Sequence, residues 1–245
     1  MNNIFYNFND KISLMLKTLK KEYERVISDY NEEKLFKKCF PICASKKCTK
    51  EQKKQVNEYI NKLFVPILKT LSSMIDDGII EWESISNKVK LPTTKVDYKL
   101  CEDLIYESWD KLYIYKYIKY NTLLNFILQL YIIFERELIS TIKKYDLSFS
   151  DSTLFSAIRF LEQKYNVNIS VEIKGKLDLY RNIINVHKHG YGISYSNIEK
   201  SNSDIINFKL NRDTYDCSFL FNLNVVSFND LYDTVLKFIS SLTLN

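Results

Sequence analysis

The sequence predicts a mainly helical protein, and three observations support that fold class. The chain has 245 residues but only 4 Gly and 3 Pro, whereas an average chain of this length carries roughly 17 Gly. A β-sandwich or barrel needs many tight turns, and this chain has too few turn residues to separate about eight strands. Apolar residues recur at three- and four-residue spacing over most of the chain, which is the period of an amphipathic helix.

Composition excludes several functional classes. Neither G-x-G-x-x-G nor G-x-x-x-x-G-K-[ST] occurs, which excludes the Gly-rich phosphate sites of dinucleotide-binding and P-loop proteins. The first ten residues lack the apolar segment of a signal peptide. The strongest apolar run, Leu123 to Phe134, is shorter than the ~20 residues of a membrane span. We therefore expect a soluble, cytoplasmic protein with no membrane partner.

The cysteines favour reduced thiols over a metal site. Cys39, Cys43 and Cys48 form C-x3-C-x4-C, while Cys101 and Cys217 stand apart. A structural zinc site needs four ligands, and both histidines lie about 140 residues further along the chain. An odd, scattered set of five cysteines also does not suggest a disulfide framework. No metal and no other cofactor is expected.

The N-terminal 97 residues are expected to form a helical region, packed separately or on the same bundle as the remainder. The first helix begins near Asn9 or Asp10 and ends before a lysine- and cysteine-rich loop at 34–54. A second helix opens with the capping box Thr49-x-x-Gln52, is kinked by Pro66 and stops at Gly78. Residues 79–97 carry mixed signals and are expected to connect this region to the next.

Residues 98–245 are expected to form a second helical domain with a small β-hairpin. The helical pattern of 98–145 predicts two helices with a break near Tyr120 and Asn121, and the second is apolar nearly all round, as in the centre of a bundle. Further helices are expected from Ser150 or Asp151 to the segment 166–170, and over 176–189. Alternating apolar residues in 205–210 and 219–225 predict the hairpin, and Ser227-x-x-Asp230 opens the last helix.

One short stretch contains both histidines of the chain. In the run Tyr180-Arg181-Asn182-Ile183-Ile184-Asn185-Val186-His187-Lys188-His189-Gly190, an Arg-Asn pair precedes His187 by five intervening residues counted from Arg181. This resembles the R-x(4–6)-H signature of the HEPN superfamily, in which a polar residue such as Asn usually follows the Arg. The apolar helix ending in Phe134-Glu135-x-x-Leu138, and the hairpin and terminal helix after the motif, agree with a HEPN-like bundle. The resemblance covers roughly 98–244.

The resemblance implies a metal-independent endoribonuclease that works as a homodimer, of the kind found as prokaryotic toxins or abortive-infection effectors. Arg181 would hold the scissile phosphate, and His187 would exchange protons with the ribose 2′-OH or the 5′ leaving oxygen. Asn182 would orient the histidine or the phosphate. Attack by the 2′-OH would leave a 2′,3′-cyclic phosphate and a 5′-hydroxyl. An antitoxin or a defence-complex partner is a further expectation of the family.

Helical geometry leaves the choice of histidine open. On an ideal helix Arg181 and His187 are about 120° apart and about 9 Å along the axis, so one helix does not aim both at one phosphate, whereas two helices across a dyad can. His187 falls among apolar neighbours, and a core histidine is the alternative for it. His189 lies about 80° from Arg181 with Asn185 between them, which makes His189 the second candidate.

Three further features extend the candidate site. Tyr191 follows His189 and resembles, at a longer spacing, the tyrosine of an R-x4-H-x-Y element that an antitoxin nucleotidylates in some HEPN toxins. Glu135 at the end of an apolar run needs a partner, for which Arg181 or Arg136 is available. Lys188 beside the motif, and the loop lysines, are candidate RNA contacts because lysines displace the counterions of a nucleic-acid backbone. The loop lysines in this set are Lys37, Lys38, Lys46 and Lys47.

Two other functions remain open on the sequence. A HEPN-like module without catalysis would dimerise or bind a partner, with residues 1–97 as the docking region. A nucleic-acid-binding protein without catalysis would use the basic loop, in which eight Lys stand against one Glu. A solvated loop in a Lys-rich chain of net charge +5 is the alternative for that same feature.

Overall fold

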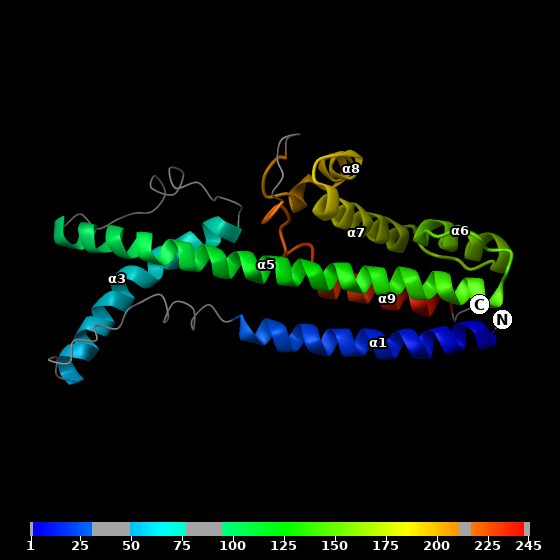
Figure 1. The fold of residues 1–245 in the computed structure, drawn as a ribbon, viewed down its shortest axis with the longest axis horizontal. Coiled ribbons are helices and arrows are strands. Elements are labelled where there is room, and N and C mark those ends of the chain that lie inside the picture. The colour runs from blue at the N-terminus through cyan, green and yellow to red at the C-terminus, as the bar shows by residue number, and fades with distance from the viewer. Residues whose placement is uncertain (1, 31–49, 77–94, 211–216, 243–245) are drawn as a thin grey trace. The chain divides into compact units, whose positions relative to one another are not determined.

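The computed structural model describes residues 2–30, 50–76, 95–210 and 217–242 (Figure 1). The described part of the chain is mainly helical and contains no strand, which confirms the predicted α class. No helix within it is long and apolar enough to cross a bilayer. In chain order the elements are α1 (Asn2–Asp29), α3 (Lys50–Asp76), α5 (Lys95–Tyr145), α6 (Leu154–Tyr165), α7 (Val171–His189), α8 (Ile193–Ser201), the 3-10 helix η1 (Ser203–Ile205) and α9 (Phe228–Ser241).

The chain forms two compact units. Unit 1 consists of Met1–Val26, Thr122–Cys217 and Leu223–Asn245, and unit 2 consists of Ile27–Asn121 and Ser218–Asn222. The division into domains at residue 97 stays a prediction. The R-x5-H stretch lies in unit 1, which therefore positions the candidate site.

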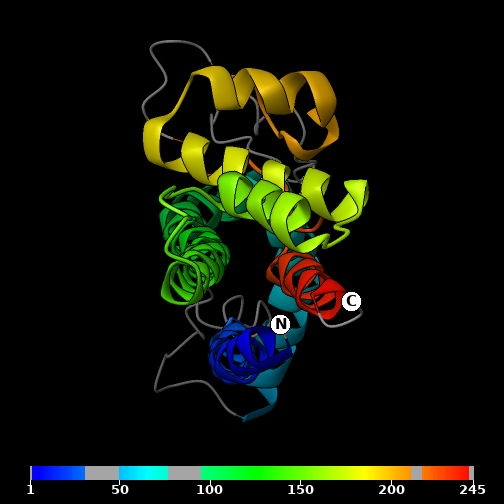
Figure 2. The same ribbon diagram turned by 90° about the vertical axis from the view of Figure 1, so that its right-hand side faces the viewer.

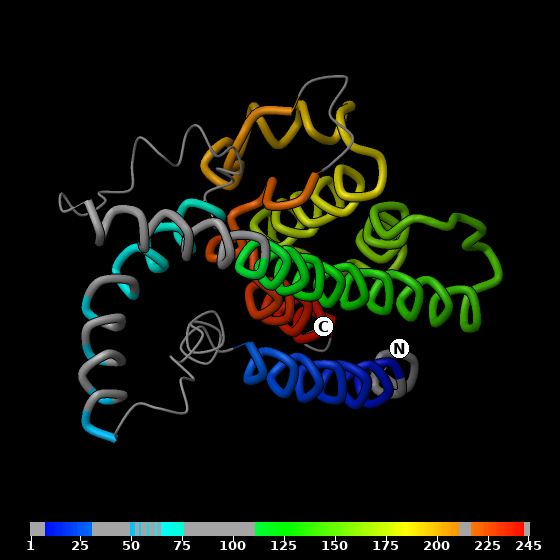
Figure 3. The backbone as a smooth tube through the Cα atoms, turned by 60° about the vertical axis from the view of Figure 1, so that its left-hand side comes forward, coloured from blue at the N-terminus to red at the C-terminus, as the bar shows by residue number. Residues whose placement is uncertain are grey.

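Helix α9 and the C-terminal half of α5 form the middle layer of unit 1. Figure 2 shows α1 on one side of this layer and α6 with α7 on the other, with α8 outermost, and Figure 3 shows the same order from another side. Phe134 of α5 and Phe238 of α9 meet edge to face at 5.1 Å, and both are fully buried. Tyr23 of α1 stacks on Phe228 of α9 at 4.3 Å. Aromatic and aliphatic burial between these helices supplies the main stabilising free energy of unit 1.

Side chains at the helix ends fix where the three helices around the motif begin. The hydroxyls of Thr153, Ser170 and Ser227 accept hydrogen bonds from the backbone N–H groups of Ser156, Ile173 and Asp230. Each bond satisfies a donor that has no partner within its helix. The helix expected to open at Ser150 or Asp151 begins instead at Leu154, because Thr153 caps it, and the helix expected to open at Ser227 is confirmed. The motif helix, expected from Lys176, begins five residues earlier because Ser170 caps it.

Helix α5 is one continuous helix of 51 residues, so the predicted break near Tyr120 and Asn121 is wrong. The Asn121 side chain donates to the carbonyl of Tyr117 at 2.9 Å, one turn back, which leaves the helical backbone intact. The Tyr120 hydroxyl accepts from the backbone N–H of Phe221 at 3.0 Å. Both polar groups therefore find partners without interrupting the helix. The boundary between units 1 and 2 nevertheless falls directly after Asn121.

The expected β-hairpin is not confirmed, since the described residues of 205–225 contain no strand and their central turn, 211–216, lies outside the described residues. In this segment two backbone N–H groups donate to tyrosine hydroxyls rather than to the carbonyls of a facing strand. Tyr195 accepts from the N–H of Leu210 at 3.0 Å, and Tyr120 accepts from that of Phe221. Phe219 has a φ of 61°, a left-handed conformation that an extended strand cannot contain.

One other boundary differs from the sequence expectations, and one helix is additional to them. Helix α1 begins at Asn2 rather than near Asn9, and it ends at Asp29, as expected, before the basic loop. Helix α8 was not expected at all. Its two buried residues, Tyr195 and Ile198, are too few to produce a clear helical period in nine residues.

An aromatic cluster around Phe219 lies in unit 2. The Phe219 ring lies 5.7 Å from that of Tyr113, 6.4 Å from that of Tyr117 and 5.2 Å from that of Tyr120.

In helix α3 one face is buried, which agrees with the helical period of its apolar residues. Helix α3 contains Pro66 and ends at Asp76, while Thr49 and Gly78 lie outside the described residues.

Candidate functional site on helix α7

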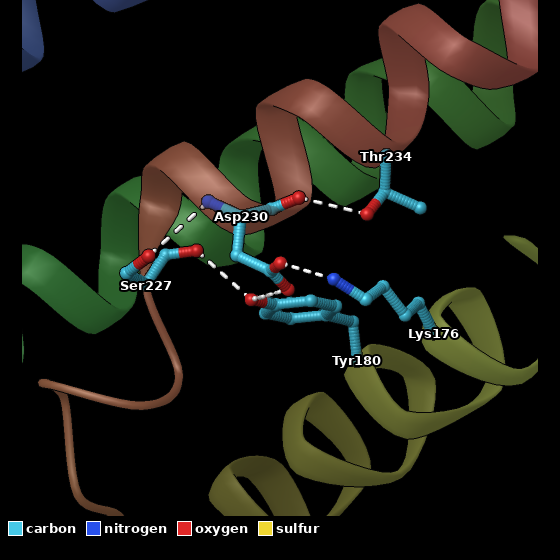
Figure 4. Close-up of polar contacts among 5 residues, drawn as sticks. All are labelled: Lys176, Tyr180, Ser227, Asp230 and Thr234. Carbon is cyan, nitrogen blue, oxygen red and sulfur yellow. Dashed lines mark hydrogen bonds and ion pairs between the residues drawn. The ribbon is translucent and has the colours of Figure 1, made fainter. Parts of the chain in front are cut away.

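A polar network attaches α7 to α9 (Figure 4). The Tyr180 hydroxyl lies 2.9 Å from the carbonyl of Ser227, to which it donates, and 3.0 Å from Asp230 Oδ2. Lys176, one turn earlier on α7, forms an ion pair with Asp230 Oδ1. Thr234 Oγ1 donates to the Asp230 carbonyl at 2.7 Å. Burial and the Asp230 carboxylate raise the pKa of Tyr180, so this hydroxyl stays a donor at neutral pH.

The Asp178 carboxylate holds both residues of the Arg-Asn pair. Its Oδ1 lies 2.5 Å from Arg181 Nη2, and its Oδ2 accepts from Asn182 Nδ2 at 3.2 Å. Residues three and four apart on a helix are surface neighbours, so the backbone of α7 itself places these three side chains together. Asn182 is 5% exposed. The Asp178 carboxylate thus fixes the orientation of a nearly buried amide and partly neutralises the motif arginine.

Arg181 is packed as well as paired. Its guanidinium carbon lies 4.8 Å from the ring centroid of Phe155 on α6, within the range of a cation–π contact. Its Nε is buried and has no hydrogen-bond partner in the described part of the chain. The side chain as a whole is 43% exposed, so the outer edge of the guanidinium remains accessible to a ligand.

Tyr131 of α5 lies in the same electrostatic surroundings as Arg181. Its hydroxyl is buried and has no hydrogen-bond partner among the described residues. Burial raises the pKa of Tyr131, the Glu135 and Asp178 carboxylates raise it further, and Arg181 opposes them. Glu135, Asp178 and Arg181 therefore all act on one buried hydroxyl, although they come from two helices.

Glu135 finds its partner at the start of α6. Its Oε1 accepts from the backbone N–H of Leu154, the first residue of that helix, at 3.0 Å. A carboxylate is stabilised there by unpaired N–H groups and by the helix dipole. Among the described residues Glu135 forms no ion pair with Arg181 or Arg136, the two partners expected from the sequence. Arg181 pairs with Asp178, and Arg136 Nε lies 3.9 Å from Glu137 Oε1. Glu135 thus acts as a helix cap.

His187 lies on a different side of α7 from Arg181. It follows Tyr180 by seven residues, which is two turns, and so it lies near the same side of α7 as Tyr180. Arg181 faces Phe155 on α6. Burial, aided by the charge of Lys188, lowers the pKa of His187, so the imidazole is neutral at neutral pH. Within one chain the structure does not bring the motif Arg and His to one point.

The remaining motif candidates lie at the C-terminal end of α7. His189 and Lys188 are exposed, and Asn185 donates to Ser194 Oγ of α8 at 3.3 Å. Tyr191 is 41% exposed and its ring lies 5.5 Å from that of Tyr195. The exposed cation and imidazole near the last carbonyls of α7 match the negative end of the helix dipole. They form an accessible polar end beyond the Arg-Asn pair.

A polar groove of about 530 Å³ lies between α7 and α8. From α7 it is lined by Asp178 and Asn182, and from α8 and its C-terminal end by Asn197 and Asn202. Its volume lies within the range of sites that hold small organic ligands. A smaller cavity of about 330 Å³ lies between Lys176 and the α9 side chains around Asp230.

Several predicted residues lie outside the described part of the chain. Those are the loop lysines Lys37, Lys38, Lys46 and Lys47, and the cysteines Cys39, Cys43 and Cys48. Cys217 is a buried free thiol. The described residues contain no group of three or more His, Cys, Asp and Glu side chains that could hold a metal ion.

Sequence reasoning missed Asp178, although its spacing of three and four residues before Arg181 and Asn182 is a readable helix-surface signal. It also missed Tyr131 and Phe155, which no local pattern connects to Arg181.

Comparison of the chain with models of known protein families, with curated proteins and with solved structures finds no match.

Proposed function

We propose that this chain is a HEPN-type endoribonuclease that cuts RNA by 2′-OH attack without a metal ion, and that it serves as a toxin or anti-phage effector in the cytoplasm. The observation that carries the proposal is the environment of the motif helix. Arg181 presents a half-exposed guanidinium beside an Asn held by Asp178, and a neutral imidazole follows on the same helix. The biological role rests on the family resemblance of the motif.

In this mechanism the neutral His187 removes the proton of the ribose 2′-OH, and the 2′ oxygen attacks the adjacent phosphorus. The bond from phosphorus to the 5′ oxygen breaks, and that oxygen takes a proton from a protonated imidazole. Arg181 holds the non-bridging oxygens and stabilises the charge of the transition state. The lowered pKa of His187 favours the role of base at neutral pH.

The diverging directions of Arg181 and His187 support a composite site made by two copies of the chain. A homodimer would bring Arg181 of one copy to His187 of the other, and the imidazolium formed when His187 accepts the 2′-OH proton would supply the proton for the leaving group. His189, exposed and closer in angle to Arg181, is the alternative histidine for either role.

The test is RNA cleavage in the presence of a chelator. Wild type is expected to convert a mixed single-stranded RNA to fragments with 2′,3′-cyclic phosphate ends, and Arg181→Ala is expected to lose this activity. Arg159→Ala, which removes an exposed arginine of α6, is the matched control and should cleave normally. The same RNA with 2′-deoxyribose throughout should stay intact. Absence of cleavage by wild type would refute the enzyme.

A second candidate function is a non-catalytic HEPN-like module that dimerises, binds a partner or binds RNA. The pairing of Arg181 with Asp178 and its packing on Phe155 favour it, because structural arginines are held in this way. An exposed apolar face on α5, formed by Ile114, Tyr117 and Ile118, offers a surface for a protein partner. Salt-sensitive RNA binding without cleavage would favour the RNA-binding form of this module.

A further inference from the structure

We infer that the groove between α7 and α8 binds a nucleobase that carries an exocyclic amino group, next to the phosphate site on Arg181. This inference deepens the proposed function and rests on it for the identity of the ligand as RNA. Its first support is position. Asp178 pairs with Arg181, and Asn182 follows Arg181 in the chain. Both residues also line the groove, so a nucleotide whose phosphate meets Arg181 can place its base in the groove.

The second support is the absence of a side chain at Gly175. Glycine is among the poorest helix formers, yet Gly175 lies inside α7 and lines the groove. A Cβ atom built at this position meets no other atom within 4 Å. Neither tight packing nor the backbone conformation therefore requires a glycine here. An open strip of helix backbone does allow a flat ligand to lie close to α7.

The third support is the chemistry of the lining. Asn197 and Asn202 offer amide oxygens and NH₂ groups, Asn182 lines the groove with its NH₂ group held by Asp178, and Leu179 and Ile198 add apolar surface. Amides and carboxylates recognise the edges of single-stranded bases by paired hydrogen bonds, and a carboxylate accepts specifically from an amino group. This combination suits adenine, guanine and cytosine. Uracil offers no amino donor.

Charge argues against a phosphate in the groove itself. Glu172 and Asp178 contribute two carboxylates to the lining. Lys176 also borders the groove, but its ammonium pairs with Asp230 of α9. The acidic lining would repel a phosphate and attract the partly positive amino hydrogens of a base. The phosphate then belongs on Arg181 and the base belongs in the groove.

The experiment compares wild type with Gly175→Leu, which fills the groove from open space, and with Gly192→Leu, a matched glycine variant whose new side chain also meets open space. Circular dichroism melting should show that both variants fold. Calorimetric titration with AMP, CMP, GMP and UMP should show that wild type binds the three amino-bearing nucleotides more tightly than UMP. Gly175→Leu should weaken that binding at least about tenfold, and Gly192→Leu should leave it unchanged.

The outcomes separate this inference from the proposed function. Selective nucleotide binding that is lost in Gly175→Leu, without RNA cleavage by wild type, would keep the groove assignment and refute the ribonuclease. RNA cleavage with equal binding of all four nucleotides, or with full binding by Gly175→Leu, would overturn the groove assignment alone. Binding of an arginine-rich peptide that Gly175→Leu abolishes, with no nucleotide binding, would overturn it in favour of a cationic peptide.

Discussion

Arg181 Nη2 lies 2.5 Å from Asp178 Oδ1, so the arginine of the motif forms an ion pair within its own helix. Both side chains are 43% exposed, and water therefore screens the pair. A phosphate that binds Arg181 must compete with this carboxylate for the same guanidinium. The Asp178 carboxylate thereby limits how tightly the site holds an anion.

Asp178→Asn is expected to tighten binding of single-stranded RNA by about two- to fivefold, the effect of removing one competing, solvent-screened ion pair. Fluorescence anisotropy with labelled RNA at fixed salt measures the affinity. Asp233→Asn removes the same charge from an exposed position on α9 and is the control. Equal tightening by both variants would show that net charge, and not release of Arg181, is responsible.

Tyr180→Phe is expected to destabilise unit 1 by about 1–2 kcal/mol, because it removes the hydroxyl that donates to the Ser227 carbonyl at 2.9 Å and lies 3.0 Å from Asp230 Oδ2. Urea unfolding followed by circular dichroism measures the change. Tyr232→Phe, which removes a hydroxyl from a ring that packs on Phe228, is the control and should change stability by less than about 0.5 kcal/mol. A similar loss in both variants would contradict a role for the Tyr180 hydroxyl.

The lowered pKa of His187 predicts a pH dependence of stability. The folded state binds a proton at His187 less readily than the unfolded state, whose histidine titrates near 6.5. Stability should therefore be unaffected by this group above about pH 6.5 and should fall as the pH drops below that value. Urea unfolding at about pH 5.5 and 7.5 measures the difference. The His187→Gln variant should lose this part of the dependence.

His189→Gln is the matched control for that experiment, since His189 is exposed on the same last turn of α7. It should retain the wild-type difference between the two pH values. If His189→Gln removes the difference and His187→Gln does not, then burial of His187 is not its cause.

Glu135→Ala is expected to destabilise the protein by about 1–2 kcal/mol, because it leaves the first N–H of α6 without its acceptor. Glu135→Gln keeps an acceptor oxygen and removes only the charge, so it should lose less than about 1 kcal/mol. Thermal melting of the two variants and wild type gives the order. Equal losses would mean that the charge, rather than the hydrogen bond, stabilises this helix end.

Local patterns predicted those features that depend on neighbouring residues in the chain. The cap at Ser227 needs only a hydroxyl three residues before an available N–H, and that bond forms at 3.1 Å. The segment between α6 and α7 begins with Asn166, which ends α6 in a left-handed conformation with a φ of 54°. It ends with Ser170, which caps α7. These signals act within one turn of helix, and the sequence displays them directly.

Features that depend on distant residues were predicted wrongly or not at all. Alternation around 205–225 indicated a hairpin, but no strand forms in its described residues, where Tyr195 accepts from Leu210 and Tyr120 accepts from Phe221. The Tyr120–Phe221 bond spans 101 residues of chain. The sequence likewise favours an arginine as the partner of Glu135, while the actual partner is the backbone N–H of Leu154, 19 residues away.

The sequence by itself determined the helical class, the position of the Arg-Asn pair and both histidines, and the approximate angle between Arg181 and His187, because helical geometry converts spacing into direction. Only the tertiary structure decided which neighbours those side chains meet. Packing of α6 against α7 places Arg181 on Phe155, and burial of His187 in the folded chain lowers its pKa. Burial and charge are properties of three-dimensional neighbours, and no local pattern encodes them.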